Sequence, residues 1–211
     1  MSVAQSERRY TIDEYLELER NSEQRHEYVD GYIYAMAGES PEHADICTNL
    51  VGEVSRQLRG GQCRVRSKDT KVLSGRPAGD RRATKGFFSY PDIVVIRGDP
   101  QYHDQGRDVL LNPSVIIEVL SKSTEAFDRG QKFLRYQNWN PTLTRYLLVS
   151  QFEPVVEQFV RTPDGKWIYQ VFQGMEQTVQ IESVSCSLRM ADVYDRIVFA
   201  AASEADDPPE E

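Results

Sequence analysis

The sequence predicts one domain of mixed α/β class, in which a central mixed sheet is flanked by helices. Residues 90–98 and 113–121 are short, nearly continuous apolar runs, which are typical of strands covered on both faces. Residues 41–58 and 124–139 carry helix start and stop signals. At 211 residues the chain is long enough for one sizeable core and too short for two. We therefore expect both helices to pack on a sheet of at least four strands.

The first elements predicted are a short helix and a hairpin. Thr11 followed by Glu14 forms a capping-box pattern, which predicts a helix starting there. Asp30 and Gly31 lie between two β-rich runs and predict a hairpin turn.

The helix over residues 41–58 has the clearest signals in the chain. Ser40 suits the N-cap, Pro41 suits the first helical position, and a pair of glycines at 60–61 ends the segment. Four apolar residues recur at helical spacing, namely Ile46, Leu50, Val54 and Leu58.

The middle of the chain alternates between strands and a loop. Residues 63–73 alternate in polarity and predict one strand, whereas residues 74–89 are rich in Gly, Pro and Arg and predict a mobile loop. The helix over 124–139 begins at a cluster of hydroxyl side chains and ends before Pro141.

The last third predicts a buried strand over 145–150 and a hairpin over 155–172, which turns at Pro-Asp-Gly. The acidic tail, 201–211, is predicted to be disordered, so the domain spans residues 1–200.

Charge is unevenly distributed along the chain. The net charge is −8, but residues 56–97 hold eleven basic and three acidic residues, a local balance of 11 − 3 = +8. This segment suits either a polyanion site or a solvated loop. The three cysteines lack metal-ligand spacing, and no stretch has the length or apolarity of a membrane span. We expect a cytoplasmic protein that does not interact with membranes.

Glu118 is an acid inside a buried strand. It shares one strand face with Ile116 and Leu120, so an unpaired carboxylate there would cost several kcal/mol in desolvation. A structural ion pair and a functional site both satisfy this constraint.

Asp92 stands at the start of another apolar strand, directly after Pro91. Two carboxylates on strands of one sheet repel unless a proton or a metal lies between them. Oxygen ligands favour magnesium or manganese over zinc. A turn or strand-start cap is the structural alternative for Asp92.

Two further residues on helices are candidates. Asp128, Lys132 and Tyr136 share one face of the predicted helix, from which Lys132 could reach the strand acids or remain an exposed lysine paired with Asp128. His43 has no second histidine at ligand spacing, so we expect a surface or hydrogen-bonded histidine.

Several motifs together identify a family resemblance. The segments are RHEYVDGYIYAM, SKDTKVL, FSYPDIVVI, NPSVIIEVLSKSTEAFDRGQKFLRYQ and RYLLVSQFEPVVEQFVR. At this spacing, YPD, EVLS-x-ST and D-x-G-x-K-x-x-x-Y resemble the Uma-two family of restriction-endonuclease-like proteins, within the PD-(D/E)XK superfamily. The likeness runs from about residue 10 to about residue 198.

The resemblance implies the restriction-endonuclease-like fold and a metal-dependent endonuclease. It assigns Asp92 and Glu118 to a Mg²⁺ or Mn²⁺ ion, with the Val119 carbonyl as a further ligand. Nucleic acid, DNA above all, would be the partner, and a homodimer is compatible with cutting two strands. A catalytically inactive member of the fold, acting by binding, is the alternative.

The resemblance also assigns the remaining catalytic positions. Lys132 would be the catalytic lysine, because the usual strand position two residues after Glu118 holds Leu120. Lys122 is a second contender for that role. Glu27 would be a further metal or water ligand, or else an exposed hairpin charge.

Nucleic-acid contacts are expected from the basic segment. The candidates are Lys71 and the loop residues Arg81, Arg82 and Lys85. Lys71 matches a family position, from which it could approach a phosphate or one of the acids, or simply flank the strand.

Overall fold

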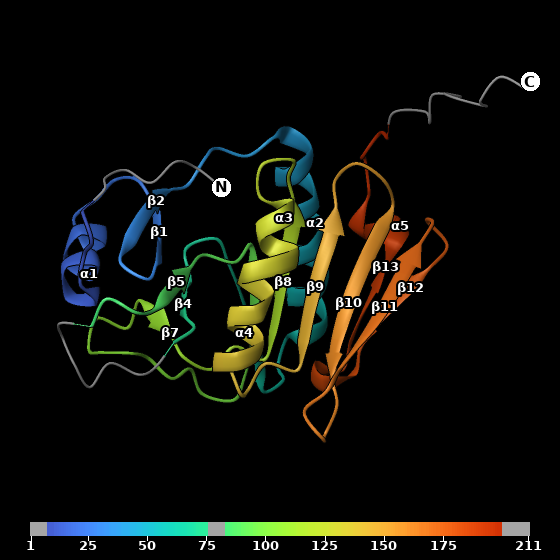
Figure 1. Ribbon diagram of the computed structural model, residues 1–211. Coiled ribbons are helices and arrows are strands. Elements are labelled where there is room, and N and C mark those ends of the chain that lie inside the picture. The colour runs from blue at the N-terminus through green and yellow to red at the C-terminus, as the bar shows by residue number, and fades with distance from the viewer. Residues whose placement is uncertain (1–7, 76–82, 200–211) are drawn as a thin grey trace, which may run out of the picture.

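Two main sheets lie side by side in the computed structural model, which describes residues 8–75 and 83–199 (Figure 1). The larger sheet has the strand order β11-β10-β9-β8-β6-β3, and the smaller has the order β2-β1-β5-β4-β7. The larger sheet consists of β3 (Cys63–Ser67), β6 (Ile93–Arg97), β8 (Val115–Leu120), β9 (Arg145–Ser150), β10 (Val155–Arg161) and β11 (Trp167–Gln173). The smaller consists of β1 (His26–Val29), β2 (Tyr32–Ala35), β4 (Lys71–Leu73), β5 (Phe87–Ser89) and β7 (Val109–Leu110).

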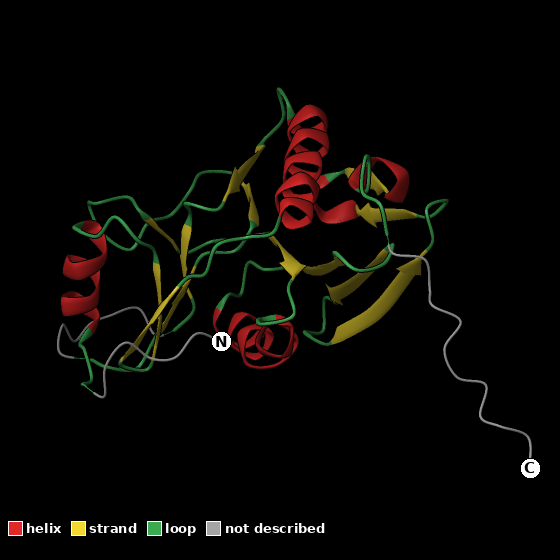
Figure 2. Cartoon of the chain, turned by 90° about the horizontal axis from the view of Figure 1, so that it is seen from above, coloured by secondary structure: helices red, strands yellow, loops and turns green. Residues whose placement is uncertain are grey.

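The other elements surround these sheets. They are α1 (Ile12–Arg20), α2 (Pro41–Leu58), α3 (Glu125–Phe127), the π-helical turn η1 (Asp128–Lys132), α4 (Phe133–Trp139), the β12–β13 ribbon (Thr178–Ile181 and Cys186–Arg189), the 3-10 turn η2 (Glu182–Val184) and α5 (Met190–Val193). Viewed from above, α2 and the α3–α4 segment cover opposite faces of the larger sheet (Figure 2).

The centre of the larger sheet is β8, which pairs parallel with β9 and antiparallel with β6. All six of its residues are buried. Val115, Ile117 and Val119 pack into the core under α2, whereas Ile116 and Leu120 pack into the core under α4. The alternation predicted from sequence is confirmed, and Glu118 therefore points to the α4 side.

Helix α2 begins and ends where its sequence signals predict. Ser40 accepts a hydrogen bond from the backbone N–H of His43, and Pro41 occupies the first helical position. Its apolar stripe is buried against the sheet, so this helix fixes one face of the core.

Three predicted elements differ from the structure. Residues 63–73 form two strands in different sheets, because Lys68 between them has a φ of 46° and breaks the extended run. The predicted loop over 74–89 contains β5, whose three residues are buried. The 124–139 helix is interrupted by the π-helical turn.

The smaller sheet is tied to α4 by its hairpin. Asp30 and Gly31 have φ values of 47° and 102°, the conformation that the predicted two-residue turn needs. The Asp30 carboxylate accepts hydrogen bonds from Arg135 on α4 and from the backbone N–H of Gly86. This contact sets β1 beside α4, which directly follows the π-helical turn that carries Lys132. The acidic tail lies outside the described residues.

Candidate active site

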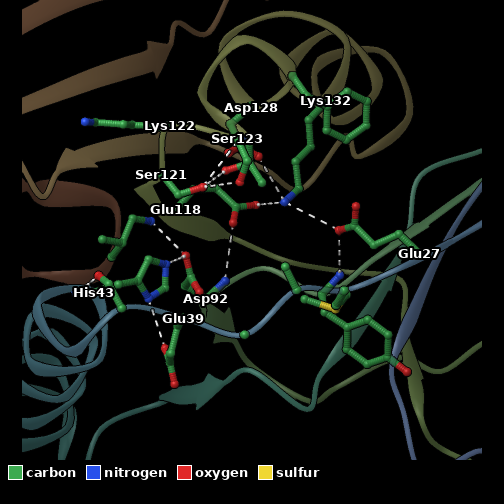
Figure 3. A pocket seen from close by; sticks show the side chains of 18 of the residues that line it. Glu27, Glu39, His43, Asp92, Glu118, Ser121, Lys122, Ser123, Asp128 and Lys132 are labelled. Atoms are coloured by element: carbon green, nitrogen blue, oxygen red, sulfur yellow. Dashed lines mark hydrogen bonds and ion pairs between the residues drawn. The ribbon is translucent and has the colours of Figure 1, made fainter. Parts of the chain in front are cut away.

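A cavity of about 720 Å³ receives side chains from both sheets and from two helical segments (Figure 3). Glu27 comes from β1, Asp92 immediately precedes β6, and Glu118 lies on β8. Asp128 and Lys132 come from the π-helical turn. The ionisable side chains that line the cavity are Arg25, Glu27, Tyr34, Glu39, His43, Lys68, Tyr90, Asp92, Glu118, Lys122, Asp128 and Lys132. The fold thus brings the four predicted catalytic residues, Glu27, Asp92, Glu118 and Lys132, into one cavity.

Asp92 and Glu118 are neighbours because of the strand register. The strands β6 and β8 are antiparallel and Ile93 pairs with Ile117. Asp92, the residue before β6, therefore lies opposite Glu118. The Val119 N–H donates to Asp92 Oδ2 at 2.8 Å, and the Asp92 N–H donates to Glu118 Oε2 at 3.4 Å. Each carboxylate is therefore oriented by the other strand's backbone.

Lys132 binds the strand carboxylate from the helix. Its Nζ lies 3.0 Å from Glu118 Oε1, 3.2 Å from Asp128 Oδ1 and 3.5 Å from Glu27 Oε1. Although burial opposes the charge, Glu118, Glu27 and Asp128 raise the pKa of Lys132 well above its usual value. The lysine is a permanent cation at neutral pH.

The acids around Lys132 outnumber it. Burial raises the pKa of Glu118 well above its ordinary value and also raises the pKa of Glu27. Tyr136 donates to Glu118 Oε1 at 3.3 Å and the Tyr90 N–H donates to Glu27 Oε1 at 3.3 Å. The raised pKa values show that protonation of Glu118 and Glu27 offsets part of the excess of three carboxyl groups over one ammonium group, and a bound cation would replace these protons.

The π-helical turn brings Asp128 and Lys132 to the cavity together, and both side chains are buried. A π-turn is an uncommon element that recurs at functional sites. The local sequence, DRGQK, carries no signal that predicts it.

His43 connects α2 to the strand acids, a role that the sequence did not reveal. Its Nε2 lies 3.3 Å from Asp92 Oδ2 and its Nδ1 lies 3.0 Å from Glu39 Oε2. The expectation of a hydrogen-bonded histidine is confirmed, whereas a surface position is excluded because the residue is buried. His43 stands three residues before Ile46 and seven before Leu50. That spacing on the buried stripe could have placed it.

The contact changes the ionisation of both groups. Although burial opposes the charge of each, hydrogen bonding and attraction between them lower the pKa of Asp92 and raise that of His43. Asp92 is thereby held as the ionised carboxylate of the pair Asp92 and Glu118.

A second group of potential ligand atoms lies beside the cavity. Atoms of Glu39, His43 and Cys47 lie within 4.8 Å of one another. Burial raises the pKa of the Cys47 thiol, so the deprotonated form that binds metals is disfavoured. The carboxylates Asp92 and Glu118 are the better ligands for a hard cation.

Lys122 lines the cavity but does not approach the strand acids. Its side chain is exposed and points away from them (Figure 3), and its Nζ lies 5.7 Å from the centre of the Phe152 ring. Of the two lysines considered for the site, Lys132 is the one that contacts Glu118.

The two predicted nucleic-acid contacts that the structure describes, Lys71 and Lys85, lie outside the cavity. Lys71 is buried, with Nζ 3.4 Å from Asp108 Oδ2, and does not line the cavity. Lys85 is exposed outside the cavity. Arg81 and Arg82 lie outside the described residues.

Two known proteins are similar to this chain over most of its length. Two Synechocystis sp. proteins, "Uncharacterized protein slr1290" and "Uncharacterized protein sll1609", are 32% and 29% identical to this chain. The first match covers 89% of this chain and 92% of the relative, and the second covers 85% and 97%.

A solved structure shows the same fold. It is the "Crystal structure of a putative nuclease belonging to DUF820 from Anabaena variabilis", with a TM-score of 0.71, 18% identity and coverage of 90% of this chain and 99% of that chain.

In the described part of this chain, no helix combines the length and the apolarity that a membrane span requires.

A family model described as "Putative restriction endonuclease" matches residues 12–191, most of the chain. Together with the relative that is 32% identical, this match confirms the resemblance inferred from the motifs. The chain belongs to the Uma2 family of restriction-endonuclease-like proteins.

Proposed function

We propose that this protein is a metal-dependent endonuclease that hydrolyses phosphodiester bonds of nucleic acid. One observation carries the proposal: Asp92 and Glu118, from adjacent strands, meet in a cavity beside a lysine that remains protonated. Buried acids of this kind are costly for stability, which favours a chemical role.

The residues present fit a divalent cation. Asp92, Glu118 and the Val119 carbonyl offer oxygen ligands, which Mg²⁺ and Mn²⁺ prefer. The excess of carboxylates over cations around Glu118 also favours an added positive charge. A cation held there would supply Lewis acidity toward water and would offset charge on the phosphate.

Lys132 is suited to electrostatic stabilisation. A group with a strongly raised pKa is a poor proton acceptor at neutral pH, so Lys132 would not act as the base. Its ammonium group would stabilise the charge that develops on the attacked phosphate, while Glu118 and Asp128 hold it in place.

Glu27 is a candidate for handling the proton of the attacking water. It lies on the opposite side of Lys132 from Glu118, with its carboxylate 3.5 Å from Nζ (Figure 3). Burial raises its pKa, which makes it a stronger base than an exposed glutamate. We assign Glu27 two tasks. It orients the attacking water, and it accepts the proton that this water loses.

The substrate would be held by cations at the cavity. Arg25, Lys68 and Lys122 line it and could contact the phosphates on either side of the cleaved bond. Lys85, Arg81 and Arg82 remain predicted contacts further along the backbone. DNA is the substrate that the family description favours.

The test is a cleavage assay on plasmid DNA, single-stranded DNA and RNA, with Mg²⁺, Mn²⁺ or a chelator. Glu118→Gln keeps the shape of the side chain and removes its charge, so cleavage should fall by at least about a hundredfold. Glu125→Gln, on α3 outside the cavity, is the matched control and should cleave normally. Cleavage that survives Glu118→Gln contradicts the proposal. Metal-dependent binding without cleavage would instead identify a non-catalytic binding protein.

A further inference from the structure

The strand β11 forms an edge of the larger sheet. In residues 8–75 and 83–199 its only strand partner is β10, with Val155 opposite Gln173 and Arg161 opposite Trp167. An edge strand presents unpaired backbone groups that can pair with another strand.

The hydrogen bonds at both ends of the β10–β11 ladder fix its phase. Thr162 N–H donates to the Lys166 carbonyl at 2.8 Å, and Gly174 N–H donates to the Pro154 carbonyl at 2.9 Å. In an antiparallel pair, residues bonded to the partner alternate with residues whose N–H and C=O point away. The even-numbered residues of β11 therefore bond β10, and the outward-pointing groups belong to Trp167, Tyr169, Val171 and Gln173.

The side chains of β11 do not protect this edge. Ile168, Tyr169 and Val171 are 49%, 52% and 51% exposed, and residues 167–173 include no charged side chain. The opposite edge of the same sheet, β3, carries Arg64 and Arg66. Charges on edge strands discourage pairing, so the two edges differ in what they permit.

We propose that β11 pairs antiparallel with β11 of a second copy of this chain, with Gln170 opposite Gln170 on the two-fold axis. In this register Trp167 lies opposite Gln173 and Tyr169 lies opposite Val171. Each residue whose backbone N–H and C=O point outward therefore faces another such residue, and the two can form hydrogen bonds. The two larger sheets become one continuous sheet across the dimer.

A second copy of this chain is the pairing partner that β11 favours. Antiparallel self-pairing generates a closed two-fold interface, in which one register satisfies both edges equally. On the faces of the combined sheet, Tyr169 packs beside Val171 and Ile168 beside Phe172, which are favourable cross-strand pairs. With a net charge of −8 the whole molecules repel, and an uncharged strand is where they can approach. The interface does not depend on the nuclease function.

Gln170 gives a direct test, because directly opposed residues in a non-bonded pair lie about 4.5 Å apart at their Cα atoms. Gln170→Lys and Gln170→Glu each place like charges across the axis. Light scattering after gel filtration, together with sedimentation over a range of concentrations, should show a wild-type dimer. Each variant should dissociate at least about tenfold more readily.

An equimolar mixture of the two variants should restore the dimer, since opposite charges then meet across the axis. This rescue also shows that both variants are folded. Gln105→Lys, at an exposed glutamine in the loop before β7, is the control for added charge and should leave the dimer unchanged. A monomeric wild type at all concentrations overturns the proposal. A dimer that survives both charge variants, or a mixture that stays monomeric, also overturns it.

Discussion

The ammonium group of Lys132 lies 3.0 Å from the Glu118 carboxylate, although Leu120 occupies the strand position where the superfamily usually has its lysine. The lysine reaches the acid from the π-helical turn that follows β8. The helical segment, not the strand, therefore supplies the ammonium group beside Glu118.

Replacing Lys132 by Met should abolish most cleavage. The loss of the ammonium group removes stabilisation of the phosphate charge, which we expect to reduce the rate about a hundredfold or more. It also leaves buried carboxylates unpaired, at a cost of about 3 to 5 kcal/mol in the free energy of unfolding. Circular dichroism should confirm that the assayed protein is folded. Lys166→Met, at a lysine whose side chain is 81% exposed outside the cavity, is the control, and equal activity losses in the two variants would contradict the assignment.

Replacing His43 by Gln should weaken metal binding. His43 orients Asp92 through the contact at 3.3 Å, and loss of such a supporting group lowers metal affinity about 10-fold to 100-fold. Calorimetric titration with Mn²⁺ measures this directly. His103→Gln, in a loop against Phe88, is the control. Unchanged affinity in His43→Gln would show that the histidine has no part in the site.

Replacing Tyr136 by Phe should separate activity from stability. Its hydroxyl contacts Ser89 Oγ at 2.8 Å and donates to Glu118 at 3.3 Å, so its removal should cost about tenfold in cleavage. Tyr146→Phe is matched, since that hydroxyl donates to the Asp128 carbonyl at 3.0 Å. Both variants should lose about 1 kcal/mol of stability in urea unfolding. Equal loss of activity in Tyr136→Phe and Tyr146→Phe would assign the loss to packing and not to the contact with Glu118.

Stability should depend on pH through Asp30. The hydrogen bond from Arg135 is the main reason that the pKa of Asp30 is lowered in the folded protein. A depressed carboxyl pKa stabilises the fold above the ordinary value of about 3.9, and this stabilisation is lost as pH falls through the folded pKa. Asp30→Asn should therefore be less stable than wild type at pH 7, with a gap that narrows below about pH 4.

Urea unfolding at several pH values measures the gap. Asp99→Asn is the control, because the side chain of Asp99 is 98% exposed. A gap between Asp30→Asn and wild type that stays constant with pH would contradict the role of the ionised carboxylate.

Local patterns predicted the elements that bury a regular face. The strand with Glu118 and the helix capped by Ser40 were found because alternation, capping and apolar spacing act over a few residues. The proximity of Asp92, Glu118 and Lys132 followed from the family motifs, since spacing along the chain does not give strand register.

Other features depend on tertiary contacts that no local pattern encodes. The break at Lys68 sends one alternating run into two sheets, and the π-helical turn shifts the backbone between Asp128 and Lys132. The spacing of His43 from the apolar stripe of α2 indicates its burial, but its contact with Asp92 depends on how α2 packs on the sheet. Lys71 matches a family position, but its burial against Asp108 depends on the packing of the smaller sheet.

The central claim is that Asp92 and Glu118 together hold a divalent cation. A crystal structure grown with Mn²⁺ and measured at the manganese absorption edge tests it most directly. We predict an anomalous peak within ligand distance of both carboxylates, lost in Glu118→Gln crystals. An anomalous peak only at the Glu39, His43 and Cys47 group, or none in the cavity at saturating Mn²⁺, would contradict the claim.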